Sequence, residues 1–173
     1  MIFVTVGSSE PFDRLIQTID LWAGSRDRTD VFAQIGRSSF VARHIQTVQF
    51  MSPSEFRERV QAARIIIAHA GMGTIISALE VGRPILVLPR REHLGETRSD
   101  HQLATAGQFA RMEGVVVAKD EADLVEKLDN LEVLEKKVMT WREASPELIS
   151  AIREFILGTE SSAGPVQAGK RPR

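Results

Sequence analysis

Short, mostly apolar runs alternate with segments of helical spacing along most of the chain, and this alternation limits the possible folds more than any other feature. Strands that are apolar throughout are typical of a parallel sheet, because the connecting helices bury both of its faces. The sequence therefore predicts an α/β fold with a mostly parallel sheet and helices on both faces. The six runs are rich in β-branched residues and span residues 2–6, 31–35, 47–50, 65–69, 85–89 and 115–118.

The segments between these runs carry helix signals. Apolar residues recur at one-face spacing after Pro11, which favours a helix that begins near that proline. Ser52 or Ser54 can cap a second helix. From Asp120 onward the pattern is helical, and the apolar residues of 148–156 form one stripe. The pattern allows that stripe to pack against the chain's own sheet or to dock another chain.

Length and composition allow one ordinary hydrophobic core. The chain has 173 residues, of which 43% are hydrophobic, and this suffices for one domain but not for two. We assign residues 1–157 to that domain. Residues 158–173 are rich in glycine, proline and serine with little to bury, so we expect a disordered tail there.

Charge and cysteine content argue against several function classes. The net charge of -1 gives no general attraction to nucleic acid, and we expect no nucleic-acid partner. The absence of cysteine excludes disulfides, thiolate metal sites and cysteine nucleophiles, and it suits a reducing cytosol. No stretch approaches the length of an apolar membrane span, so we expect any membrane association to come from a partner or from one face of the protein.

The sequence His-Ala-Gly-Met-Gly-Thr (residues 69–74) joins the fourth apolar run to a helical segment. Gly71 permits a tight turn, Gly73 lets a ligand approach the backbone, and Thr74 can hydrogen-bond near the helix start, where backbone N–H groups lack partners. This arrangement suits a diphosphate, although a plain strand-to-helix turn explains the same spacing equally well. A dinucleotide fingerprint would need glycine at Ile76, so a nicotinamide-binding Rossmann protein is a weaker alternative.

A strongly polar segment, residues 89–102, follows the fifth apolar run. Ligands of open α/β sheets bind outside the carboxyl ends of the strands, so this segment is expected to share one rim with residues 7–9 and 69–74 and with Gln34 and Gly36. A solvated loop would explain the charge of the segment alone. Its amide, imidazole and guanidinium groups could instead bind sugar hydroxyls and phosphate. No metal-binding spacing occurs, and we expect no metal.

Segments in this order resemble the C-terminal, nucleotide-sugar-binding domain of GT-B glycosyltransferases of family 28. They are residues 4–16, 32–36, 69–74 with 82–90, and the Asp-His-Gln of 100–102. The chain is most similar to free-standing versions of that domain, such as bacterial exopolysaccharide glucuronosyltransferase subunits and the N-acetylglucosaminyltransferase subunit of the dolichol pathway. The resemblance covers about residues 1–157 and implies a Rossmann-like fold that forms a single half of a GT-B enzyme.

The resemblance also implies roles for particular residues. The 69–74 turn would hold the donor diphosphate and nearby ribose, and the first loop would face the same cleft. Ser77 stands where many relatives carry a ribose-binding glutamate, and Ser8 and Ser9 replace a more common Thr-His or Thr-Thr pair, so the sequence departs from the family pattern there. The donor-binding positions implied are Gly7, Ser8, Ser9, Gly71, Met72, Gly73, Thr74, Ser77, Arg91, His101 and Gln102.

The implied reaction is an inverting transfer of a hexose from a UDP-sugar to a polyprenyl-diphosphate-linked acceptor in polysaccharide synthesis. The UDP-sugar is the donor substrate, and no cofactor is expected. Arg90 or Arg91 would stabilise the leaving UDP, and His69 is the best local candidate for a base. Glucuronic acid is favoured over N-acetylglucosamine, because Arg90, Arg91 and Arg98 could bind a carboxylate.

A GT-B enzyme carries out its reaction in the cleft between two domains, and this chain supplies one of those domains. The resemblance therefore implies a heterodimer with a membrane-anchored subunit similar to the GT-B N-terminal half, which would bring the acceptor and recruit the chain to the inner membrane face. The acceptor base would also lie on that partner. The alternative is a non-catalytic nucleotide-sugar-binding or regulatory subunit that uses the same pocket.

Overall fold

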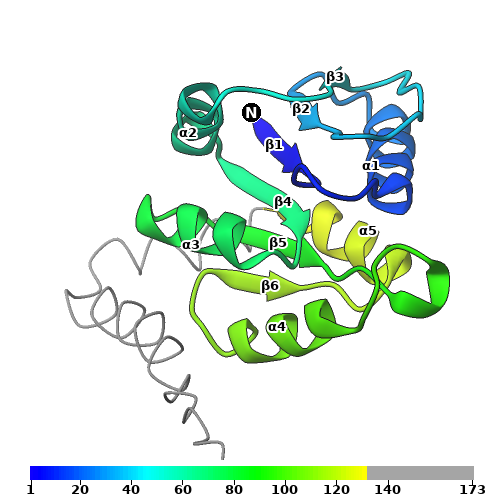
Figure 1. Ribbon diagram of the computed structural model, residues 1–173. Coiled ribbons are helices and arrows are strands. Elements are labelled where there is room, and N and C mark those ends of the chain that lie inside the picture. The colour runs from blue at the N-terminus through cyan, green and yellow to red at the C-terminus, as the bar shows by residue number, and fades with distance from the viewer. Residues whose placement is uncertain (132–173) are drawn as a thin grey trace, which may run out of the picture. The chain divides into compact units, whose positions relative to one another are not determined.

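The computed structural model describes residues 1–131. Six strands form one sheet in the order β3-β2-β1-β4-β5-β6, and each neighbouring pair is parallel (Figure 1). All six predicted strands are present, and the prediction of a mostly parallel sheet is confirmed. The strands are β1 (Ile2–Thr5), β2 (Val31–Gln34), β3 (Gln46–Val48), β4 (Ile65–His69), β5 (Ile85–Leu88) and β6 (Val115–Val117).

Helices cover both faces of this sheet, as predicted. Helices α1 and α5 pack against each other on one face, α2 and α3 lie together on the other, and α4 packs beside β6 (Figure 1). This is the Rossmann-like arrangement that the resemblance implied. The helices are α1 (Asp13–Ser25), α2 (Pro53–Ala62), α3 (Met72–Glu80), α4 (His101–Phe109) and α5 (Glu121–Asp129), with a short 3-10 helix η1 (Glu92–Leu94).

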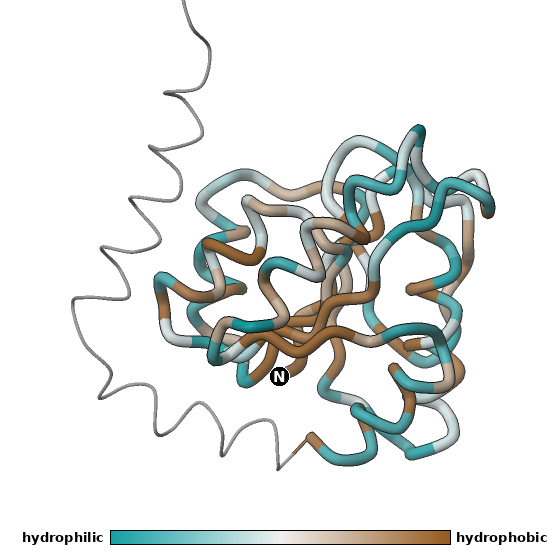
Figure 2. The backbone as a smooth tube through the Cα atoms, turned by 90° about the horizontal axis from the view of Figure 1, so that it is seen from below, coloured by the Kyte–Doolittle hydropathy of each residue, from teal (hydrophilic) through white to brown (hydrophobic). Residues whose placement is uncertain are grey.

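The central strands are buried along their whole length because the sheet is covered on both sides. Every residue of β1 and β5 is buried, and Figure 2 shows the hydrophobic strands gathered between more polar helices and loops. On one face of β1, Ile2 and Val4 join the core beneath α1 and α5. On the opposite face Phe3 packs edge-on against Phe56 of α2, so Phe56 points toward the sheet.

Local signals fix where the helices begin. Ser52 caps α2: its side chain accepts from the Glu55 amide, and the Glu55 carboxylate accepts from the Ser52 amide. This reciprocal pair decides between the two predicted caps. Helix α1 begins at Asp13, slightly after the predicted Pro11, because Phe12 is drawn into the core and stands at the N-cap position. Asp120 caps α5 through the amide of Asp123.

The strand order places a topological switch point at β1. The chain leaves β1 for β2 on one side, whereas β4 pairs with β1 on the other. In open α/β sheets a crevice forms at such a point, because the two connections depart in opposite directions. The loops that follow β1 and β4 therefore flank the natural ligand position of this fold.

Two sequence predictions lie outside the described residues: the apolar stripe of 148–156 and the tail of 158–173. Within residues 1–131, no helix combines the length and the apolar content that a bilayer crossing requires.

Candidate functional site

His69, the last residue of β4, packs between two glycines at the switch point. A Cβ atom on Gly7 would lie 2.8 Å from Cε1 of the imidazole, and one on Gly71 would lie 2.2 Å from Nε2. Gly7 has a φ of +75°, so both its backbone conformation and the nearby ring favour glycine there. Gly71 has an ordinary φ of -89°, so at this position the imidazole alone excludes a side chain.

Burial keeps the His69 imidazole neutral. The pKa of His69 is lowered from 6.5 to about 4, mainly by desolvation and secondly by the positive charge of Arg90. A backbone contact with Thr5 raises this pKa but does not offset the two larger effects. Its Nδ1 atom is buried and has no hydrogen-bond partner among residues 1–131. A neutral imidazole with this pKa is a weak base at neutral pH. The packing of His69 thus favours a role in spacing the loops after β1 and β4 over the predicted role in proton transfer.

The N-terminus of α3 presents unpartnered backbone donors beside this histidine. Gly71, the N-cap, offers no side-chain acceptor, and the first helical hydrogen bond runs from the Ile75 amide to the Gly71 carbonyl. No described residue accepts from the amides of residues 72–74. A Cβ atom on Gly73 would meet nothing within 4 Å, so this glycine leaves its backbone open to a ligand. Oriented amides, a helix dipole and free space together suit an anion.

The loop after β1 forms the opposite side of the switch point. Ser8 and Ser9 are exposed there, and the Gly7 carbonyl accepts from the side-chain amide of Gln34 at 3.0 Å. Gln34 is buried; its carbonyl oxygen accepts from Thr5 Oγ1 at 2.6 Å, and its amide also reaches the Gln49 carbonyl. We expected Gln34 on the ligand rim, but the structure uses it to hold the backbone of the first loop.

Arg90 is buried behind the same loop, with only 4% of its surface exposed. Its Nη2 group donates to the carbonyls of Val6, at 2.8 Å, and Glu10. The guanidinium carbon lies 5.1 Å from the centre of the Phe12 ring, and burial lowers the pKa of Arg90. The backbone amide of Arg90 donates to Oε1 of Gln102 at 3.1 Å. These contacts join three predicted site segments, those after β1 and β5 and the start of α4.

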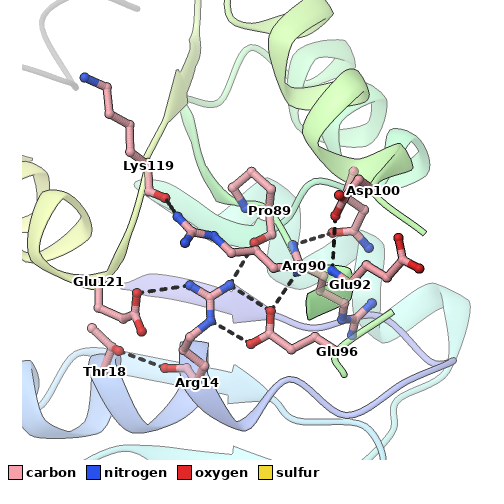
Figure 3. Close-up of polar contacts among 11 residues, drawn as sticks. Arg14, Thr18, Pro89, Arg90, Glu92, Glu96, Asp100, Lys119 and Glu121 are labelled. Carbon is pink, nitrogen blue, oxygen red and sulfur yellow. Dashed lines mark hydrogen bonds and ion pairs between the residues drawn. The ribbon is translucent and has the colours of Figure 1, made fainter. Parts of the chain in front are cut away.

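The polar segment after β5 is anchored by an ion-pair network that sequence reasoning missed (Figure 3). Arg14 of α1 donates to both carboxylate oxygens of Glu96, at 2.6 and 2.8 Å, and to the Pro89 carbonyl. It also pairs with Glu121 of α5. Burial lowers the pKa of Arg14, but Glu96 and Glu121 together outweigh that effect, and the pKa is raised overall. No local spacing relates two residues 82 positions apart, so only the tertiary structure shows the pair.

The remaining predicted residues take different positions in this segment. Arg91 is half-buried; its backbone amide donates to the Glu96 carboxylate, and its side chain donates to the Lys119 carbonyl. His101 is exposed at the first position of α4, and Gln102 is half-buried beside it. Ser77 is half-buried on α3. Among residues 1–131, the structure gathers no group of histidines and carboxylates that could hold a metal ion.

Comparison with known proteins shows the family. The sequence model of the Glycosyltransferase family 28 C-terminal domain matches residues 1–154, most of the chain. The chain belongs to the glycosyltransferase family 28 C-terminal domain family. The resemblance seen in the sequence motifs is thereby confirmed, and the turn of residues 69–74 lies at the switch point of a family 28 domain.

Similar proteins include two relatives named UDP-N-acetylglucosamine transferase subunit ALG13. The one from Homo sapiens is 30% identical over 118 residues, covering 62% of this chain and 10% of the relative. The one from Yarrowia lipolytica is 23% identical over 137 residues, covering 69% of this chain and 65% of the relative. The family 28 domain described here thus spans less than two thirds of either relative's length.

The solved structures confirm the fold. The crystal structure of the kitacinnamycin glycosyltransferase matches with a TM-score of 0.59 at 17% identity, covering 92% of this chain and 42% of that one. The family 28 domain therefore has the fold of a GT-B half, which agrees with the prediction from its sequence.

Proposed function

We propose that this family 28 domain is the donor-binding, catalytic subunit of a two-component glycosyltransferase that uses a UDP-sugar. The observation that carries the proposal is the α3 N-terminus, where the amides of residues 72–74 lack partners and Gly73 leaves free space at the switch point. The ALG13 relatives are named as subunits of a UDP-N-acetylglucosamine transferase, and this supports the assignment.

In the proposed reaction an acceptor hydroxyl attacks the anomeric carbon, the bond from that carbon to the UDP oxygen breaks, and the configuration inverts. The charge that develops on UDP would be stabilised by the α3 amides and dipole. The proton of the acceptor would pass to a base on the partner subunit, because His69 is packed between glycines with a pKa lowered to about 4. No cofactor takes part.

The partner that we propose is a membrane-anchored subunit equivalent to the other half of a GT-B enzyme. The chain has the fold of one half, while GT-B neighbours such as the kitacinnamycin enzyme are more than twice the aligned length. That partner would supply a polyprenyl-diphosphate-linked acceptor and hold the chain at the cytoplasmic face of the membrane. The product would enter polysaccharide synthesis.

We propose glucuronic acid as the transferred sugar and N-acetylglucosamine as the second candidate. Of the three arginines considered, Arg90 donates to main-chain carbonyls and Arg91 to the Lys119 carbonyl, whereas Arg98 is exposed next to the start of α4. An exposed guanidinium near the predicted sugar-binding pair His101 and Gln102 suits a donor carboxylate.

Calorimetric titration tests donor binding, with UDP-glucuronate, UDP-glucose, UDP-N-acetylglucosamine and UDP as ligands of the chain with and without its partner. Sugar transfer is then measured with the partner for wild type, His101→Ala and Gln102→Ala. We expect both variants to lose transfer. His101→Ala should keep UDP affinity within about threefold, because this exposed side chain is proposed to contact the sugar alone, whereas Gln102→Ala also removes the acceptor of the Arg90 amide and should weaken UDP binding as well. Unchanged turnover in both variants would show that the sugar contacts are assigned wrongly.

Sugar-transfer measurements with the partner distinguish the alternative, non-catalytic role from the proposed one. A non-catalytic regulatory subunit would bind the UDP-sugar, yet its partner would transfer sugar equally well when Gly73→Val blocks the nucleotide site. Absence of any uridine nucleotide binding to the chain, alone and with its partner, would refute both roles.

A further inference from the structure

Arg90 carries a buried positive charge that no carboxylate neutralises through a direct bond among residues 1–131. A buried charge costs several kcal/mol unless polar partners compensate it. Its partners are the carbonyls of Val6 and Glu10, both held by the single Nη2 group. Those two carbonyls bracket residues 7–9, so one guanidinium nitrogen fixes both ends of the first loop.

The backbone that carries Arg90 is itself held from two sides. Its amide donates to the side chain of Gln102, and the carbonyl of the preceding Pro89 accepts from Arg14 at 2.9 Å (Figure 3). Arg90 is therefore a fixed point against which the loop after β1 is placed. Within that loop, Ser8 and Ser9 are exposed and make no hydrogen bond to any described residue.

Together these contacts couple the two sides of the switch point. His69 separates the Gly7 and Gly71 backbones, and Arg90 holds the loop that continues from Gly7. A loop that is already ordered loses less conformational entropy when a ligand binds, which raises affinity. The tie at Arg90 thus pre-orders the two exposed serines of the first loop.

We propose that Arg90 is a positioning residue: by binding the carbonyls on either side of residues 7–9, it holds Ser8 and Ser9 in place for a diphosphate at the N-terminus of α3. This differs from the expectation that Arg90 touches the leaving group. The identity of the ligand rests on the proposed function, whereas the tie between the loops does not.

Arg90→Lys and Arg90→Met form a matched pair of variants. Because one nitrogen makes both carbonyl bonds, the ammonium of lysine can replace it, whereas methionine fills similar space without a donor. We expect Arg90→Met to weaken UDP binding about tenfold and Arg90→Lys about threefold or less, as measured by calorimetry on the full chain. Arg26→Met is the control, because Arg26 pairs with Asp129 on the surface.

A double-mutant cycle separates positioning from a merely structural role. If Arg90 acts through the first loop, its loss adds little once Ser8 and Ser9 are alanines, so Arg90→Met weakens UDP binding less than about twofold in that background. Additive effects would instead mean that Arg90→Met acts on the whole fold, and the proposal would fail. It would also fail if the double alanine variant bound UDP as tightly as wild type.

Hydrogen exchange of the ligand-free chain tests the tie without any nucleotide. We expect the Val6 and Gly7 amides, whose hydrogen bonds lie at the base of this loop, to exchange at least about tenfold faster in Arg90→Met, and at wild-type rates in Arg90→Lys and Arg26→Met. Unchanged exchange in Arg90→Met would overturn the proposal even if UDP binds. If wild type binds no UDP while exchange responds as expected, the proposed function fails and the loop tie alone stands.

Discussion

The imidazole of His69 occupies the space that a side chain on Gly71 would need, since a Cβ atom there would lie 2.2 Å from Nε2. Two residues further along, a Cβ atom on Gly73 would meet nothing within 4 Å. The two glycines of one turn therefore have different physical causes. Gly71 is required by the packing of the protein itself, whereas Gly73 borders open space that the proposed donor would use.

Alanine at each glycine is expected to separate these two causes. Gly71→Ala should lower the free energy of unfolding by about 1–3 kcal/mol, because the buried imidazole has to move. Gly73→Ala should leave it unchanged or raise it by up to about 1 kcal/mol, because alanine is the better helix former, yet it should weaken UDP binding. Urea unfolding and calorimetry measure the two effects.

A second substitution checks the reason for the Gly71 effect. His69→Ala removes the ring, so adding Gly71→Ala to it should cost less than adding Gly71→Ala to wild type. Equal costs in both backgrounds would show that contact with His69 is not the cause.

The pKa of His69 predicts acid sensitivity. The pKa is lowered from 6.5 to about 4 in the fold. Below pH 6.5 His69 therefore binds a proton in the unfolded chain, whereas in the folded chain it stays neutral down to about pH 4. The free energy of unfolding should therefore fall as pH drops through this window, by up to about 3 kcal/mol. Urea unfolding at several pH values measures the slope in wild type and in His69→Gln.

The glutamine variant should show a shallower slope, by up to about 1.4 kcal/mol per pH unit, because one titrating group is missing. In wild type, the proton resonances of His69 should not shift between about pH 5.5 and about pH 8. A midpoint near the ordinary histidine value in that titration would contradict the buried, neutral imidazole.

The pair of Arg14 and Glu96 predicts a stability effect at a distance from the core. Only 12% and 11% of these side chains are exposed, so Arg14→Met leaves a largely buried carboxylate without its cation. We expect a loss of about 3 kcal/mol in the free energy of unfolding. Arg26→Met breaks a solvent-exposed pair with Asp129 and should cost clearly less. Similar losses in the two variants would refute the difference in burial as the cause.

Arg98 predicts donor selectivity. Arg98→Ala should weaken binding of UDP-glucuronate about tenfold and leave that of UDP-glucose within about twofold, since only the former donor carries a carboxylate. Titration of both donors with the partner present measures the ratio. Arg64→Ala is the control, because Arg64 directly precedes β4 and so lies at the opposite end of that strand from residues 69–74. An equal loss for both donors would remove Arg98 from the proposed carboxylate contact.

The fold was predictable because its signals are local. Five of the six strands are mostly apolar runs that the covering helices largely bury, whereas the edge strand β3 leaves Gln46 and Thr47 exposed. The capping pattern at Ser52 marks the start of α2. The 47–50 run was placed slightly too far along the chain, since β3 ends at Val48 and Phe50 is 52% exposed. An aromatic residue in a short run does not reveal by itself where an edge strand stops pairing.

The site was predictable only in part. Gly71 and Gly73 are close in sequence, so their spacing predicted the strand-to-helix turn that the structure contains, whereas the anion at this turn stays a prediction. Three arginines after β5 looked equivalent in the sequence. The structure distinguishes them, because Arg90 is buried against the first loop while Arg98 is exposed.

The sequence by itself determined the alternation of strands and helices, the parallel sheet and the glycine turn at the end of β4, because periodicity, capping and glycine conformation act over a few residues. Only the tertiary structure decided that Gln34 and Arg90 hold the first loop and that Arg14 reaches Glu96. These contacts join residues that are far apart in sequence and that only folding brings within hydrogen-bond distance. Local spacing in the sequence therefore does not reveal them.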